Sequence, residues 1–189
     1  MEAVKIMPES DYALLKQIVE EYLPGTSPDN LKKICAKHPT AVVGYYIENK
    51  SVGVCYGLEI DNESFMLDGI AIVEPYNAAG RGGKLIAFFE QRVSDLGYKS
   101  ISLGSADGYV ERFYLKNGYT PVELKIYVEG EAWRDKCKNF KYPAVYTQAE
   151  GERTKLVIKV TDYPAMNKKE ITEYYGGTHS FFVFEKKFI

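Results

Sequence analysis

The stretch whose residues best suit a chemical task is a glycine-rich loop between a predicted strand and a predicted helix. It covers residues 76–84 and has the sequence Tyr-Asn-Ala-Ala-Gly-Arg-Gly-Gly-Lys. Glycines and alanines allow a tight turn that exposes main-chain N–H groups, and the helix that follows points the positive end of its dipole at the same place. Arg81 and Lys84 add positive charge, and no carboxylate lies between Glu74 and Glu90. The sequence therefore predicts a cradle for a phosphate-type anion.

Two common phosphate-binding motifs do not fit this loop. The dinucleotide-binding pattern G-x-G-x-x-G requires glycine at the position of Leu85. The P-loop pattern requires glycine at the position of Ala78 and Ser or Thr at that of Leu85. An isolated Arg-Gly-Gly is too short to indicate RNA binding. A different class of anion site is therefore indicated.

Four helices are predicted from apolar residues at helical spacing and from typical terminal residues. They cover residues 10–23, 28–36, about 84–96 and about 108–117. Ser27 followed by Pro28 is a good N-cap and first-turn pair for the second helix. The third helix ends at Gly97, and its buried face is expected to carry Leu85, Phe89, Val93 and Leu96.

Strand-like periodicity predicts a sheet around these helices. The expected strands cover residues 3–7, 40–48, 51–60, 64–74, 99–104, 119–128 and 180–188. Residues 130–178 differ in character, with a polar loop, a strand at 155–161 and a short helix that Asn167 opens with capping-box spacing to Glu170. We therefore predict a single domain, residues 1–189, in which 130–178 is an insertion between the last two strands.

Composition limits the classes of function. The chain has 189 residues, of which 46% are hydrophobic and 26% charged, which is ordinary for one soluble domain. A net charge of −2 gives no support to nucleic-acid binding. Three widely spaced cysteines and two histidines indicate reduced thiols and no metal site. Without a leader sequence or a long apolar run, we expect a cytoplasmic protein with no membrane contact.

Two motifs about 30 residues apart resemble those of the GNAT family of N-acetyltransferases. Asn77-Ala78-Ala79-Gly80-Arg81-Gly82 resembles the family's Q/R-x-x-G-x-G/A signature. Residues 107–119, Asp-Gly-Tyr-Val-Glu-Arg-Phe-Tyr-Leu-Lys-Asn-Gly-Tyr, resemble its N-x-x-A-x-x-F-Y-x-x-x-G-F/Y segment. The flanking stretches 68–73 and 184–188 resemble the family's fourth and last strands.

The resemblance implies an α/β (α+β) fold of the GNAT type. Its centre would be a mixed, mostly antiparallel twisted sheet of about seven strands flanked by about four helices. The insertion at 130–178 would add a strand and a helix before the last strand.

The resemblance also implies direct transfer of an acetyl group from acetyl-CoA to a primary amine, with no metal. Main-chain groups of the fourth strand would hold the pantetheine arm, and amides of the glycine loop would hold the pyrophosphate. The residues expected to bind acetyl-CoA are Ile70, Ala71, Ile72, Asn77, Ala78, Ala79, Gly80, Arg81, Gly82, Gly83, Lys84, Asp107 and Tyr114.

Two residues are candidates for catalysis. Tyr114 matches the Tyr of the family's Phe-Tyr pair and would be the general acid for the leaving thiolate; the alternative is a core tyrosine. Asp68 is the one acid inside the central apolar strand, and strict alternation places it on the face of Ile70 and Ile72. A bulge at Gly69 would turn it elsewhere. Asp68 would then serve as general base, directly or through a water, or bind a cationic acceptor; the alternative is a structural carboxylate.

The chain departs from the family pattern at three positions. Asn77 replaces Gln or Arg, Asp107 replaces Asn, and Val110 replaces Ala. Binding should survive at Asn77, because main-chain groups hold the phosphates. Asp107 would repel a phosphate if its side chain contacts the cofactor, but it also suits a helix N-cap.

The resemblance leaves the acceptor open between a small-molecule and a peptide amine. Residues 23–27 and the insertion 130–178 would shape the acceptor side; the insertion is a lid, an acceptor wall or a homodimer contact. Two other functions remain open on the same fold: a catalytically inactive module that binds or senses acyl-CoA, and a protein-interaction module.

Overall fold

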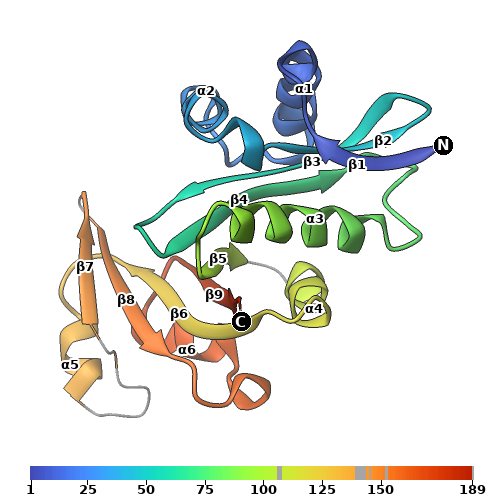
Figure 1. Cartoon of the computed structure of the whole chain (residues 1–189). Helices are drawn as coiled ribbons and strands as arrows, with labels where there is room; N and C mark the ends of the chain where they lie inside the picture. The colour runs from blue at the N-terminus through green and yellow to red at the C-terminus, as the bar shows by residue number, and fades with distance from the viewer. Residues whose placement is uncertain (106–107, 139–143, 145, 152, 189) are drawn as a thin grey trace. The chain divides into compact units, whose positions relative to one another are not determined.

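The computed structural model describes residues 1–105, 108–138, 144, 146–151 and 153–188 (Figure 1). The predicted contribution of Asp107 to cofactor binding lies outside these residues. The chain forms two units, one made of residues 1–102 with the last residues from Lys187, and the other of residues 103–186.

The first unit contains a pair of consecutive helices, a run of three consecutive strands, and a third helix between that run and the next strand. Its helices are α1 (Tyr12–Tyr22), α2 (Pro28–Lys37) and α3 (Arg81–Asp95). Its strands are β1 (Glu2–Ile6), β2 (Val43–Ile47), β3 (Lys50–Glu59), β4 (Ser64–Ile72) and the start of β5 (Ser100–Ser105). Neighbouring strands from β1 to β4 pair in antiparallel fashion, and β4 runs parallel to β5.

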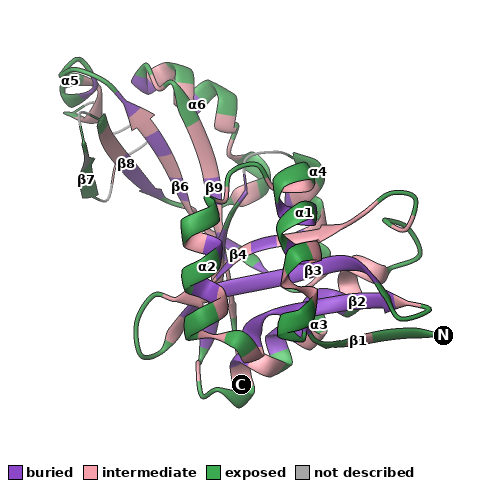
Figure 2. Cartoon of the chain, turned by 90° about the horizontal axis from the view of Figure 1, so that it is seen from above, coloured by how far each residue is buried: buried purple, intermediate pink, exposed green. Residues whose placement is uncertain are grey.

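Helices cover both faces of this part of the sheet. Helices α1 and α2 lie over one face and α3 lies under the other (Figure 1). Helix α1 packs on β3 and β4, α2 packs on β3, and α3 packs on β2, β3 and β4. Most residues of β2 and β3 are therefore buried (Figure 2). On the α3 side, the buried residues of the helix include Leu85, Phe89 and Val93, as predicted. Leu96 differs, with 43% exposure, because α3 ends at Asp95 and Leu96 is its C-cap.

The second unit is built around a sheet that the insertion extends. Its helices are α4 (Gly108–Lys116), α5 (Trp133–Lys138) and α6 (Lys168–Tyr175), and its strands are β6 (Thr120–Val128), β7 (Tyr146–Glu150), β8 (Arg153–Lys159) and β9 (His179–Lys187). Strand β6 pairs with β9 on one side and with β8 on the other, and β7 forms a hairpin with β8; all three pairs are antiparallel.

The predicted fold class is confirmed; the described residues form nine strands, where about seven were expected. Two short elements of the insertion, α5 and β7, were not predicted. Local signals were reliable where they depend on neighbouring residues: the N–H of Asn30 donates to Ser27 Oγ at 3.1 Å, and the N–H of Glu170 donates to Asn167 Oδ1 at 3.1 Å. One domain with an insertion at 130–178 stays a prediction.

Candidate functional site

The glycine loop joins the end of β4 to the start of α3. The N–H of Tyr76 donates to the carbonyl of Val73 at 2.8 Å, which starts the turn. Ala79 and Gly80 then adopt the left-handed conformation, with φ of 59° and 73°. This conformation costs a residue with a Cβ roughly 1–2 kcal/mol, whereas glycine adopts it freely. Gly80 is the N-cap of α3, so the turn delivers the chain directly into the helix.

The main-chain amides of this turn are largely unused by the protein. The N–H of Arg81 makes a long bond of 3.4 Å to Ala78, and that of Lys84 donates to Gly80 at 3.2 Å. No described residue accepts a hydrogen bond from the main-chain N–H groups of residues 77–80, Gly82 and Gly83. Unpaired N–H groups at a helix N-terminus are the usual ligands of phosphate groups. The turn therefore has the open amides that phosphate-binding turns use, and its binding of the cofactor stays a prediction.

The two cations of the loop behave differently. The guanidinium of Arg81 donates to Glu2 Oε1 through Nε at 3.1 Å and Nη2 at 2.7 Å, and to the carbonyl of Tyr76 at 3.3 Å. Its side chain therefore fastens the loop to β1. Lys84 is exposed and forms no ion pair with a described residue. Lys84 places a positive charge at the start of α3, where it also acts on Glu2, and phosphate contacts by the Arg81 and Lys84 side chains stay predictions.

Strand β4 leaves part of one edge open. It pairs with β5 only over Ser64–Met66, opposite Ser100–Ser102. Beyond that point its ladder in the described chain involves β3 alone, where Ile70, Ala71 and Ile72 lie opposite Cys55, Val54 and Gly53. No described strand pairs with the other edge of residues 67–72, and an edge of this kind is what an extended ligand uses in strand addition; binding of the pantetheine arm by Ile70, Ala71 and Ile72 stays a prediction.

Asp68 occupies a bulge in β4. Tyr56 of β3 lies opposite Gly69, and Gly57 lies opposite Leu67, so that Asp68 is the extra residue. The predicted bulge is confirmed, and strict alternation was the wrong guide. Asp68 accepts a hydrogen bond from the α1–α2 loop, and Ala71 packs with the α1–α2 core; the bulge brings both to the same face.

A chain of hydrogen bonds ends on Asp68. The phenol of Tyr56 donates to Thr26 Oγ1 at 2.9 Å, and the hydroxyl of Thr26 donates to Asp68 Oδ2 at 3.3 Å. Burial raises the pKa of Asp68, and the bond from Thr26 opposes that rise. Burial also raises the pKa of Tyr56 to about 12, so the phenol stays protonated at neutral pH. A half-buried carboxylate with a raised pKa is suited to accept a proton.

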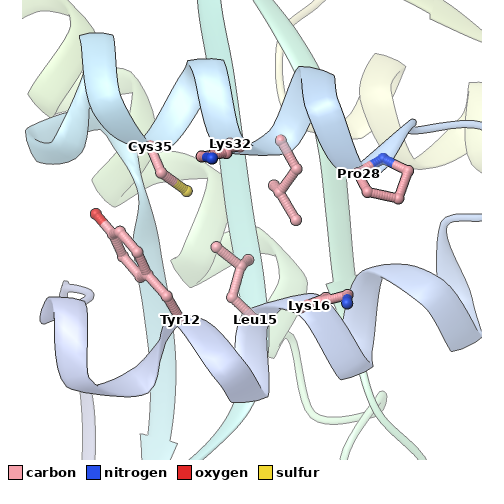
Figure 3. Close-up of a pocket in the computed structure, with 7 residues that line it drawn as sticks. Tyr12, Leu15, Lys16, Pro28, Lys32 and Cys35 are labelled. Carbon is pink, nitrogen blue, oxygen red and sulfur yellow. The ribbon is translucent and has the colours of Figure 1, made fainter.

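The helices on either side of Thr26 enclose a separate cavity of about 200 Å³. Figure 3 shows Tyr12, Leu15 and Lys16 of α1 facing α2, where Pro28, Lys32 and Cys35 line the other side. Burial raises the pKa of the Cys35 thiol to about 11, which leaves it uncharged and unreactive at neutral pH. This partly open pocket between α1 and α2 is lined mainly by apolar atoms.

Tyr114 lies on α4 in the second unit. Its side chain is 5% exposed, and its ring packs against those of Phe113, Tyr119 and Phe184, with centroids 5.3, 5.6 and 6.0 Å away. Tyr114 is thus part of the core of that unit, and its role as general acid stays a prediction.

Sequence reasoning named Asp68 but missed its partners Tyr56 and Thr26. They lie 12 and 42 residues before it, and no spacing rule joins them; the only signal was the assignment of residues 23–27 to the acceptor side. Over the part of the chain that the structure describes, no three His, Cys, Asp or Glu side chains gather as a metal site would require. Nor does any described helix combine the length and apolarity of a membrane span.

Comparisons with known proteins agree with this geometry. The family described as "Acetyltransferase (GNAT) domain" matches residues 11–135. No curated protein matches the chain.

Several solved structures share its fold. The mosquito arylalkylamine N-acetyltransferase like 5b is 12% identical with a TM-score of 0.63, and the match covers 100% of both chains. Ard1 from Thermoplasma volcanium is 14% identical with a TM-score of 0.59, over 85% of this chain and 99% of that one. A GNAT family acetyltransferase from Elizabethkingia anophelis with acetyl-CoA bound is 13% identical with a TM-score of 0.57, over 99% and 98%.

At these identities the solved structures establish the fold, and the family match establishes the kinship. Together with the open amides before α3 and the bulged, half-paired β4, they lead to one conclusion: the chain belongs to the GNAT acetyltransferase family.

Proposed function

We propose that the protein is an acetyl-CoA-dependent N-acetyltransferase that moves the acetyl group directly to a primary amine. The observation that carries the proposal is the turn before α3, whose amides at residues 77–80, 82 and 83 have no acceptor in the described chain. These amides and Lys84 suit the pyrophosphate of the donor. The Elizabethkingia relative was solved with acetyl-CoA bound, which supports the same donor here.

Acetyl-CoA, when bound, supplies the acetyl group as an activated thioester. The open edge of β4 at Ile70, Ala71 and Ile72 is placed to hold an extended arm through main-chain hydrogen bonds. A main-chain N–H near Ile70 would stabilise negative charge on the carbonyl oxygen during transfer.

Asp68 is the proposed base. An alkylamine enters largely as an ammonium ion, since its pKa resembles that of Lys, about 10.4. Asp68 forms no ion pair with a described residue, so its carboxylate is available to attract the ammonium and to remove a proton, directly or through a water. Nitrogen then bonds to the carbonyl carbon, the carbon–sulfur bond breaks, and Tyr114 is the proposed donor of a proton to the thiolate.

A binding-only protein is the alternative, and the packing of Tyr114 within its own unit favours it. The acceptor class also belongs to the proposal. The mosquito neighbour is an arylalkylamine N-acetyltransferase by name, so arylalkylamines are the first acceptors to test, followed by a polyamine and a peptide with a free N-terminus.

Calorimetry with acetyl-CoA, followed by thiol release with these amines, tests the proposal. Gly82→Glu should abolish donor binding, because it places a bulky negative side chain among the anion-binding amides. Asn62→Glu adds the same charge at an exposed loop position and should bind normally. Equal affinity of Gly82→Glu and the wild type would place the donor elsewhere. Binding without thiol release from any amine would leave the binding-only alternative.

A further inference from the structure

Two hydroxyl groups lead to Asp68 in a chain of hydrogen bonds in which each donates to the next: Tyr56 of β3 donates to Thr26, and Thr26 donates to the Asp68 carboxylate. We propose that Tyr56 and Thr26 are positioning residues that hold Asp68 ionised and oriented as a base. The inference rests on the proposed function, in which Asp68 accepts the proton of the amine. It adds two residues to that site and predicts how they control its pH dependence.

The direction of the chain follows from the donors available. A threonine hydroxyl has one proton, which it can donate to only one acceptor at a time. The Tyr56 phenol donates to Thr26 Oγ1 at 2.9 Å, so a lone pair of Thr26 is engaged there and its own proton points to Asp68 Oδ2, 3.3 Å away. Tyr56 therefore selects the orientation of the Thr26 hydroxyl that favours a charged carboxylate.

The position of Tyr56 is fixed by the sheet. Its side chain is fully buried, and in the β3–β4 ladder it lies opposite Gly69. A Cβ at position 69 would lie 2.4 Å from the Tyr56 hydroxyl oxygen and 2.5 Å from Cζ, so the phenol occupies the space that the absent side chain leaves. The phenol cannot turn away from Thr26 without a larger repacking.

The position of Thr26 depends on the loop between α1 and α2. Its main-chain N–H donates to the carbonyl of Leu23 at 3.1 Å, which caps the end of α1. The Ser27 N-cap then begins α2. The Thr26 hydroxyl therefore belongs to residues 23–27, the segment expected to shape the acceptor side. Its hydrogen bond to Asp68 connects this segment to the proposed base.

Few other groups act on Asp68. Among the described residues, Thr26 of the loop and Tyr56 of β3 are the ones that interact with it, and Tyr56 is the titratable one. No described Lys, Arg or His forms an ion pair with it. Burial favours the protonated carboxyl, and the bond from Thr26 is the one interaction that opposes it. Without this bond, Asp68 would hold a proton over more of the pH range, so a smaller fraction of the protein would carry the free carboxylate on the acid side of that range.

The test measures the pKa of the Asp68 carboxyl by carbon NMR in the full chain without acetyl-CoA, with Asp68→Asn to assign the signal. Thr26→Val keeps the shape and removes the donor, and should raise the pKa by about one unit, the size expected from losing a bond to a charged group. Thr26→Ser should restore the wild-type value. Tyr56→Phe should raise the pKa by less, because Thr26 keeps its proton but loses its fixed orientation. Thr147→Val, an exposed strand threonine, is the matched control.

A second measurement follows kcat/KM against pH. If Tyr56 and Thr26 hold Asp68 ionised, the fall of kcat/KM on the acid side moves to higher pH in Thr26→Val, by the same amount as the pKa measured by NMR. A merely structural role of Thr26 would lower kcat/KM at every pH and leave the position of that fall unchanged. An unchanged Asp68 pKa in Thr26→Val overturns the inference, and if that variant does not fold, Tyr56→Phe decides it by the same measurement. If Thr26→Val shifts the Asp68 pKa but the wild-type protein acetylates no amine, the hydrogen-bond chain is supported and the proposed function is rejected.

Discussion

Replacing Gly69 with Ala tests whether the close approach of β3 and β4 beside Asp68 is as tight as the structure indicates. The added methyl would lie 2.4, 2.5 and 2.8 Å from the hydroxyl oxygen, Cζ and Cε1 of Tyr56. Carbon atoms in contact normally lie about 3.5–4.0 Å apart, so the ring must move by roughly 1 Å. Tyr56 is fully buried, and we expect a shift of that size to weaken or break its 2.9 Å bond to Thr26.

The free-energy cost has three parts. Overpacking a buried site typically costs about 1–3 kcal/mol. Loss of the Tyr56–Thr26 hydrogen bond adds about 1 kcal/mol. Replacing glycine within a strand restores roughly 0.5–1 kcal/mol through the smaller entropy of the unfolded chain. We therefore expect Gly69→Ala to lower the free energy of unfolding by about 1–3.5 kcal/mol, and to raise the pKa of Asp68 as Tyr56→Phe does.

Urea unfolding followed by circular dichroism measures this cost. Gly25→Ala is the matched control, because no atom lies within 4 Å of its added methyl, and it should change stability by no more than about 0.5 kcal/mol. Tyr56→Leu shortens the opposing side chain, so the double variant with Gly69→Ala should lose less than the sum of the two single losses. Two results would show that the Tyr56 ring does not occupy the space of the added methyl: additive losses of unfolding free energy in the double variant, or equal unfolding free energies of Gly69→Ala and Gly25→Ala.

Two further predictions concern single side chains. Tyr114→Phe should lower kcat by about 10²-fold or more if the phenol is the general acid, while calorimetry gives an unchanged affinity for acetyl-CoA; an unchanged kcat would remove Tyr114 from the mechanism. For Cys35, a pKa raised from the ordinary 9.0 to about 11 lowers the thiolate fraction at neutral pH about 100-fold, so alkylation by iodoacetamide should be slow and still accelerate above pH 9. Labelling of Cys35 as fast as a free thiol, with Cys35→Ala as the blank, would contradict its burial between α1 and α2.

Features set by neighbouring residues could be predicted from the sequence. The cap at Ser27 and the cap at Asn167 depend on side chains that reach only three residues along the chain. The glycine loop was recognised for the same reason, since small residues before a helix define a turn with open amides. Its fine geometry was less obvious: Ala79 takes the left-handed conformation although it has a Cβ.

Features set by tertiary packing could not be predicted. Arg81 was expected at a phosphate, yet its guanidinium binds Glu2, which lies 79 residues away. Thr26 and Asp68 are separated by 42 residues, and only the β3–β4 register with its bulge brings them together. Strand β7 was missed because residues 146–149 are all exposed, so no alternation of apolar and polar residues marks it. Helix α5 has six residues, too few for a helical period to stand out.

The contacts of the insertion bear on whether residues 153–175 act as a lid. Strand β8 pairs with β6 along Glu123–Val128, which anchors the first part of this segment in a sheet. The later part is held by Glu111 of α4, which is 5% exposed and binds Lys168 Nζ at 2.5 Å and the phenol of Tyr163 at 2.8 Å. A lid made of residues 153–175 would have to separate these groups at each opening, so the contacts disfavour a lid, and the acceptor wall and the homodimer contact both stay predictions.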